Sequence, residues 1–205
     1  MSNSIVFADG INGSVNFSES PLTLSAFSQT LRGEVGRSAC EVVIRYMEPL
    51  VWIEIGPSGH GGVSAYERAE AYRLRSVVGA VVFKPQHRDD MSEVFTALGV
   101  STAASFDRRV EPDFIYREVG NSRVPVVCEL AGYEAADHEA YHRRLEDKEA
   151  HYRRPGQPWK YRRVIGANTV PPTSISGLAV NVDHVVLSRR SRSLLLAKMV
   201  ETFSE

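Results

Sequence analysis

Three ionisable residues in one stretch, residues 111 to 152, have types and spacing that could do chemistry together. Asp113 opens one β-rich segment, Glu129 closes the next, and Lys148 lies in the helical segment that follows. Carboxylates hold hard divalent cations, and an ammonium group can stabilise negative charge on a phosphate. The pattern therefore suggests a site for a divalent metal and a phosphodiester, if the surrounding elements bring the three side chains together.

The spacing of the two acidic residues permits them to share one face of a hairpin. Asp113 and Glu129 lie 16 positions apart on segments predicted to be neighbouring antiparallel strands, and side chains alternate between the faces of a strand. With a three-residue loop at 120–122, the two carboxylates fall directly opposite each other. A loop of two or four residues would shift the register by one. Gly120 and Asn121 tolerate the left-handed conformation that a three-residue loop needs, so the arrangement is permitted but not forced.

The helical end of the stretch has a lysine within its apolar stripe. Tyr141, Leu145, Lys148 and Tyr152 follow one another at helical spacing, so they share one face. A lysine in such a stripe either extends to the rim of the packed surface or points at a charged partner. Aimed at the two carboxylates, Lys148 could position an attacking water or stabilise charge on a phosphate. Both orientations remain open from the sequence.

Two carboxylates held this close would repel each other, and a hard cation such as Mg²⁺ (or Mn²⁺) would relieve that repulsion. Such a cation is commonly held by one or two carboxylates, with water and substrate phosphate completing its shell, and it can activate water. The alternative is purely structural. In it, Asp113 caps a turn after Pro112, and Glu129 sits at an exposed strand end.

The pattern resembles a known group of enzymes. Pro112-Asp113, followed by a hairpin and Glu129, is similar to the PD-(D/E)XK nuclease superfamily of restriction and repair endonucleases. The segment VVCELAG at 126–132, followed by Tyr141, Lys148 and Tyr152, resembles a plasmid- and phage-associated branch. The resemblance implies a restriction-endonuclease-like fold around these residues.

The same resemblance implies roles for particular residues. Asp113 and Glu129 would be metal ligands, and Glu93, on the preceding helix, would supply the further acidic residue that many members have. The superfamily lysine normally lies two residues after the glutamate, where this chain has Ala131. Lys148 is then either a displaced replacement, or the domain is a nuclease-like scaffold without cleavage activity.

Clusters of arginine suggest contacts to a nucleic-acid backbone, although the formal net charge is only −1. Arginine matches phosphate geometry better than lysine does, and local clustering matters more than total charge. The residues expected to bind nucleic acid are Arg143, Arg144, Arg153, Arg154, Arg162 and Arg163. The alternative is that these arginines only form solvated faces.

The bulk composition indicates a globular protein with a real core. The chain has 205 residues, of which 43% are hydrophobic and 24% charged. No apolar run approaches the ~20 residues that would span a bilayer, and the first residues lack the pattern of a secretory signal. The two cysteines are far apart, which makes a disulfide framework or a zinc knuckle a poor explanation. We therefore expect a cytoplasmic protein without a membrane partner.

The remaining periodicity predicts an α/β (or α+β) fold, a mixed central sheet flanked by helices. Residues 1–90 would form a β-rich N-terminal region and 91–205 the nuclease-like core, with one continuous domain as the alternative. Ser64 and Glu67 form a capping-box pattern at the start of one helix. Strands are predicted at 4–17 (a hairpin), 40–47, 50–55, 77–85, 160–170 and 178–187, and helices at 22–35, 64–77, 91–99 and 188–203.

Two functions from different classes fit these features. The first is a metal-dependent nuclease that hydrolyses DNA phosphodiester bonds, with Asp113, Glu129 and Lys148 as catalytic residues. The second is a catalytically inactive, nuclease-like binding or structural protein of a mobile element such as a phage or plasmid, acting through protein or nucleic-acid contacts. The sequence leaves open whether the chain forms a homodimer or binds another protein.

Overall fold

The computed structural model describes residues 40–56, 61–86, 88–100, 111–119, 124–132, 139–165, 181–187 and 189–203. Its strands are β1 (Cys40–Met47), β2 (Leu50–Ile55), β3 (Val81–Pro85), β4 (Phe114–Arg117), β5 (Pro125–Ala131), β6 (Lys160–Ile165) and β7 (Asn181–Leu187). Its helices are α2 (Gly61–Arg73), α3 (Arg75–Val78), α4 (Arg88–Ala97), α5 (Glu139–Tyr152) and α6 (Arg189–Phe203).

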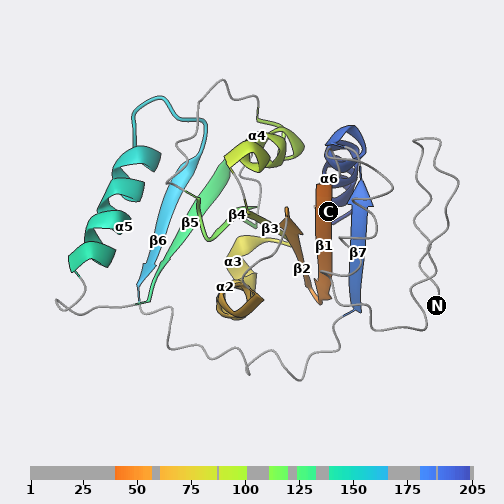
Figure 1. Cartoon of the computed structure of the whole chain (residues 1–205), viewed down its shortest axis with the longest axis horizontal. Coiled ribbons are helices and arrows are strands. Elements are labelled where there is room, and N and C mark those ends of the chain that lie inside the picture. Colours follow the sequence, from red (N-terminus) through yellow and green to blue (C-terminus); the bar gives the residue numbers. More distant parts are fainter. Residues whose placement is uncertain are drawn as a thin grey trace, which may run out of the picture.

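The described strands form one mixed sheet of seven, in the order β6-β5-β4-β3-β2-β1-β7. Two neighbouring pairs are parallel, β2 with β3 and β5 with β6, and the other four are antiparallel. Figure 1 shows this order from β6, beside α5, to β7, beside α6. A mixed sheet flanked by helices confirms the predicted α/β fold class.

The directions of β3, β4 and β5 bring one end of each strand to the same edge of the sheet. β4 runs antiparallel to both β3 and β5. The beginning of β4 therefore lies at the same edge of the sheet as the C-terminal ends of β3 and β5. Side chains at these three positions meet although they come from distant parts of the sequence.

Two hydrophobic clusters pack on the sheet. One joins apolar side chains of α4 and α6 to the strands, and it includes Tyr152 of α5 and Trp159. The other joins Ala71 and Val78, of α2 and α3, to Trp52, Phe114 and other strand residues. Because side chains alternate along a strand, the central strands β2, β3, β4 and β5 are covered on both faces, which explains their nearly continuous apolar sequences.

Several predicted elements are confirmed, with shifted ends. β1 and β2 pair antiparallel around Glu48-Pro49, and the helices predicted at 64–77, 91–99 and 188–203 are present as α2 with α3, α4 and α6. The capping prediction is wrong, because α2 begins at Gly61 and Ser64 therefore lies within its first turn. The hairpin at 4–17 and the helix at 22–35 lie outside the described residues.

The sheet continues across the boundary predicted near residue 90. β3 pairs with β4, and β1 pairs with β7, so strands from both predicted regions contribute to the same sheet. In the part of the chain that the structure describes, no helix is long and apolar enough to cross a membrane.

Candidate active site

Asp113 and Glu129 lie near each other at the edge of the sheet where β4 begins and β5 ends. The strands pair Phe114 with Cys128, and Asp113 directly precedes this pair while Glu129 directly follows it. The backbone N–H of Asp113 donates to Cys128 O at 3.1 Å, and the N–H of Leu130 donates to Asp113 Oδ2 at 2.5 Å. The register predicted for the hairpin is confirmed from Phe114 opposite Cys128 to Arg117 opposite Pro125, but the strand pairing ends before Asp113.

Lys148 points at a charged partner and not at the rim. Its Nζ lies 2.5 Å from Glu129 Oε1, and the side chains of Lys148 and Glu129 are only 12% and 4% exposed. Leu145 and Tyr152, on the same face of α5 as Lys148, are buried. Trp159 Nε1 also donates a hydrogen bond to the backbone carbonyl oxygen of Tyr152 at 3.1 Å. Because these contacts fix the rotation of the helix, Lys148 is directed at the end of β5.

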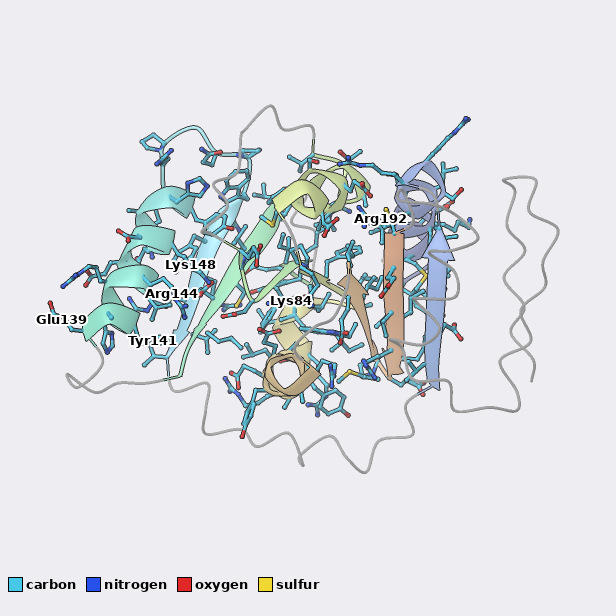
Figure 2. All side chains as sticks on the ribbon, in the orientation of Figure 1. Lys84, Glu139, Tyr141, Arg144, Lys148 and Arg192 are labelled. Carbon is cyan, nitrogen blue, oxygen red and sulfur yellow. The ribbon has the colours of Figure 1, made fainter. Side chains whose placement is uncertain are left out.

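Tyr141 anchors the same face of α5 to the backbone that follows Glu129. Its hydroxyl accepts a hydrogen bond from Gly132 N at 2.9 Å and donates to Leu130 O at 3.3 Å. The Arg144 guanidinium lies over the Tyr141 ring, 5.9 Å from its centroid. Figure 2 shows Tyr141, Arg144 and Lys148 on the side of α5 that faces the sheet, with Glu139 on the other side.

Two residues that the sequence analysis did not place in the site complete the charged cluster. Lys84, near the end of β3, donates from Nζ to Glu67 Oε1 of α2 at 2.9 Å and to Pro112 O at 3.1 Å. Lys84 also interacts electrostatically with Asp113 and Glu129, and the Asp113 carboxyl lies close enough to Glu67 to raise the pKa of Glu67. The cluster therefore contains three carboxyl groups and two ammonium groups.

Burial makes this cluster take up protons near neutral pH. Burial raises the pKa of Glu67 to about 7; Lys84 opposes the rise and Asp113 adds to it. Burial, together with the Asp113 carboxylate, also raises the pKa of Glu129 to about 7 against the opposing effect of Lys148. Burial opposes the charge on Lys84, but the surrounding carboxylates outweigh it, and the pKa of Lys84 is raised. Three acidic groups beside two basic ones leave an excess of negative charge that a proton or a cation can balance.

Two carboxylate oxygens of the cluster lack hydrogen bonds, and an oxygen of this kind could bind a hard cation. Glu67 Oε2 and Glu129 Oε2 are buried and accept no hydrogen bond from the described residues, which is costly for carboxylate oxygens. Within those residues, no group of three or more His, Cys, Asp or Glu side chains could hold a metal ion by itself. A hard cation at this place would therefore take only one or two carboxylates and would need water and phosphate for the rest of its shell.

Glu93, expected as a metal ligand, is engaged elsewhere. It lies on α4, and its carboxylate accepts hydrogen bonds from Arg189 Nε at 2.7 Å and from Arg192 Nη2 at 2.8 Å. Arg192 also donates to Asp90 Oδ1 at 2.7 Å, so the group joins α4 to α6. The third acidic residue beside Asp113 is Glu67 of α2.

Most of the expected nucleic-acid-binding arginines pair with groups of the chain itself. Arg143 is bonded to Glu139, and Arg153 and Arg163 are both bonded to Glu149. Arg162 donates to Tyr116 Oη at 2.8 Å and lies 3.9 Å from Glu118. Among the described residues, exposed Arg144 and Arg154 have no ion-pair partner.

One sequence signal could have revealed Lys84. A lysine stands near the end of an otherwise apolar strand, VVFKP, and a charge within a buried strand needs a partner. Glu67 had no comparable signal, because a glutamate on an amphipathic helix is ordinary, and here it is 4% exposed only because α2 packs over the end of β3.

In comparisons with known proteins, no family model, no curated protein and no solved structure matches this chain. The geometry of the charged cluster is therefore the basis on which we infer a function for this chain.

Proposed function

We propose that the chain is a metal-dependent nuclease that hydrolyses DNA phosphodiester bonds at the edge of the sheet where Asp113, Glu129 and Lys148 meet. The observation that carries the proposal is the 2.5 Å contact between Lys148 Nζ and Glu129 Oε1, with the Asp113 carboxyl close enough to interact electrostatically with Glu129. This placement supports Lys148 as the replacement for the lysine that the PD-(D/E)XK pattern would have at Ala131.

Each residue would have a definite task. Asp113 and Glu129 would hold Mg²⁺ or Mn²⁺, which when bound supplies activation of water and stabilisation of charge on the phosphate. Lys148, on a helix anchored by Tyr141 and Tyr152, would exchange its contact with Glu129 for a water or a phosphate oxygen. An ammonium group held in a nearly dry environment stabilises developing negative charge better than one in water.

Contacts to DNA would come first from arginines that have no acidic partner nearby. Arg144 lies one helical turn before Lys148, on the same side of α5, and its guanidinium is exposed. A phosphate bound by Arg144 would lie next to the cluster, which suits contacts to the backbone that carry no sequence information. Arg143, Arg153, Arg162 and Arg163 would first have to leave their present partners.

The second candidate is a nuclease-like protein that binds without cleaving. Two observations favour it: Lys84 and Lys148 already bind Glu67 and Glu129, and four of the six expected arginines are paired within the chain. A cluster neutralised in this way could serve only to join α2 and α5 to the sheet.

Nicking of supercoiled plasmid with Mg²⁺ or Mn²⁺ separates the two candidates. We expect the wild type to nick DNA, and Asp113→Asn to lower the rate by at least about 100-fold, because a lost metal ligand removes transition-state stabilisation. Glu201→Gln is the matched control, since it removes one carboxylate from an exposed pair with Lys198. Equal rates for wild type and Asp113→Asn, or no nicking by either at high protein concentration, would favour the non-catalytic candidate.

A further inference from the structure

We propose that Arg45 and Arg68 form a phosphate-binding site beside the charged cluster, on the face of the sheet that α2 covers. The ligand is a phosphate group, and in DNA it would be a backbone phosphate near the one that is cleaved. The phosphate site stands without the proposed function, whereas its use for DNA rests on that function.

The two guanidinium groups bind the same carboxylate oxygen. Arg45 Nε donates to Glu54 Oε1 at 3.2 Å, and Arg68 Nη1 donates to the same atom at 2.7 Å. Trp52 Nε1 also donates to it at 3.0 Å, so this single oxygen accepts all three hydrogen bonds. Because Arg45 lies on β1 and Arg68 on α2, the shared oxygen holds two guanidinium groups from different elements next to each other.

One carboxylate cannot neutralise two guanidinium groups. Arg45 and Arg68 each carry a positive charge, and Glu54 supplies one negative charge between them, which leaves an excess of positive charge. Burial lowers the pKa of Arg68, and the charge on Arg45 lowers it further, although Glu54 acts in the opposite direction. The two guanidinium groups therefore repel each other, and a bound anion relieves that repulsion.

Both arginines keep donors that a ligand can use. No described residue accepts a hydrogen bond from Arg45 Nη1 or Nη2, or from Arg68 Nε or Nη2. These nitrogen atoms are not sealed from solvent, and the two side chains are 26% and 13% exposed. The planar guanidinium group matches the oxygen atoms of a phosphate and stays charged, so the pair suits a phosphate group that enters from the solvent side.

The phosphate site lies at the same edge of the sheet as the charged cluster. Glu54 and Lys84 are partners in the parallel pairing of β2 with β3. Lys84 Nζ in turn donates to the carbonyl oxygen that directly precedes Asp113. Two strand spacings, about 10 Å, separate β2 from β4. Since successive nucleotides rise about 3.4 Å along one strand of B-DNA, a phosphate at Arg45 would lie about three nucleotides from one at Asp113.

Titration of the full chain with inorganic phosphate tests the site, by calorimetry at constant ionic strength and without divalent cations. The variants are Arg45→Met, Arg45→Lys and Glu54→Gln. Arg75→Met is the matched control, because it removes an exposed arginine of α3 whose contacts are with Tyr72. Arg45→Met leaves Arg68 to pair with Glu54, and circular dichroism establishes that each variant is folded.

We expect one phosphate per chain in the wild type and in Arg75→Met. Arg45→Met should weaken phosphate binding at least about tenfold, because it removes a charge-assisted hydrogen bond. Arg45→Lys should recover only part of that loss, because an ammonium group lacks the guanidinium fork. Glu54→Gln should tighten binding at least about threefold, because it keeps an oxygen for the three donors but removes the negative charge. A purely structural group would lose stability in these variants without such opposite changes in affinity.

Fluorescence anisotropy with a short labelled DNA duplex, in EDTA, tests whether DNA uses the site. Arg45→Met should weaken DNA binding at least about threefold and lower its salt dependence by about one phosphate contact. The same measurement on Arg75→Met should give the affinity of the wild type.

Each contrary result has a separate meaning. A wild type that binds no phosphate, equal phosphate affinities of the wild type and Arg45→Met, or weaker binding by Glu54→Gln would overturn the phosphate site. Weaker binding of phosphate by Arg45→Met with unchanged binding of DNA would overturn its use for DNA. A wild type that binds phosphate through Arg45 but nicks no plasmid would contradict the proposed nuclease and leave the phosphate site in place.

Discussion

Replacing Lys148 with methionine tests the electrostatics of the site without assuming any activity. In the wild type, the ammonium group lies 2.5 Å from Glu129 Oε1, and both side chains are nearly excluded from solvent. Methionine keeps much of the volume of the lysine stem but leaves Glu129 Oε1 without its donor. The Oε2 atom of Glu129 already lacks a hydrogen bond from the described residues, so the whole carboxyl group becomes unpaired.

The loss of stability should depend on pH, because Glu129 can escape the unpaired state by binding a proton. Its pKa in the folded protein is raised from 4.5 to about 7, so in the wild type this group contributes stability below pH 4.5 that is lost as pH rises through about 7. Removing Lys148 raises that pKa further, and the variant continues to lose stability above pH 7 where the wild type no longer does. We expect a deficit of about 3–5 kcal/mol near pH 8.5, typical of breaking a buried pair, and about 1 kcal/mol near pH 5.5.

Urea unfolding followed by tryptophan fluorescence measures both deficits. Lys148→Met/Glu129→Gln should recover most of the stability at pH 8.5, because it removes the unpaired carboxylate. Lys198→Met, which breaks an exposed pair with Glu201, should change stability by less than about 1 kcal/mol at either pH. A deficit that is equal at the two pH values, or below about 1 kcal/mol at pH 8.5, would refute the reasoning.

Two further predictions concern the other charged groups. Arg192→Met should lower the free energy of unfolding by about 3–5 kcal/mol in urea, because it removes a buried guanidinium that bonds both Asp90 and Glu93 and joins α4 to α6. Exposed Arg190→Met is its control, and equal effects of the two variants would contradict this role of Arg192. Arg144→Ala should weaken DNA binding and lower the salt dependence by about one phosphate contact in fluorescence anisotropy. Arg143→Ala should have a smaller effect, since that guanidinium is bonded to Glu139, and a larger effect of Arg143→Ala would argue against contacts on the Lys148 side of α5.

Local patterns were sufficient to predict much of the central stretch. The period of two in residues 113–131 predicts the hairpin, and the predicted register is the one that pairs Phe114 with Cys128. The period of 3.6 in α5 places Lys148 on the same face as Leu145 and Tyr152. Local periodicity determines which face of an element is apolar, so residues on one hairpin and its following helix can be placed from the sequence.

Local periodicity does not predict the partner of Glu93. A glutamate on the helix before β4 was expected to face the metal, but α4 packs against α6, whose arginines bind it. The sequence contains no local signal for that packing, because α6 lies almost 100 residues further along the chain. A charged side chain takes the nearest counter-charge available in the folded protein, and only the packing of helices decides which one that is.

By itself, the sequence determined the types of most elements, the register of the hairpin from Phe114 to Arg117, and the apolar face of α5 on which Lys148 lies. Only the tertiary structure decided that Glu67 and Lys84 complete the site. Their elements reach the cluster because β3 pairs with β4 and α2 packs over the end of β3. The physical reason is that hydrophobic periodicity specifies a buried face, whereas pairing between distant strands depends on the packing of the whole sheet.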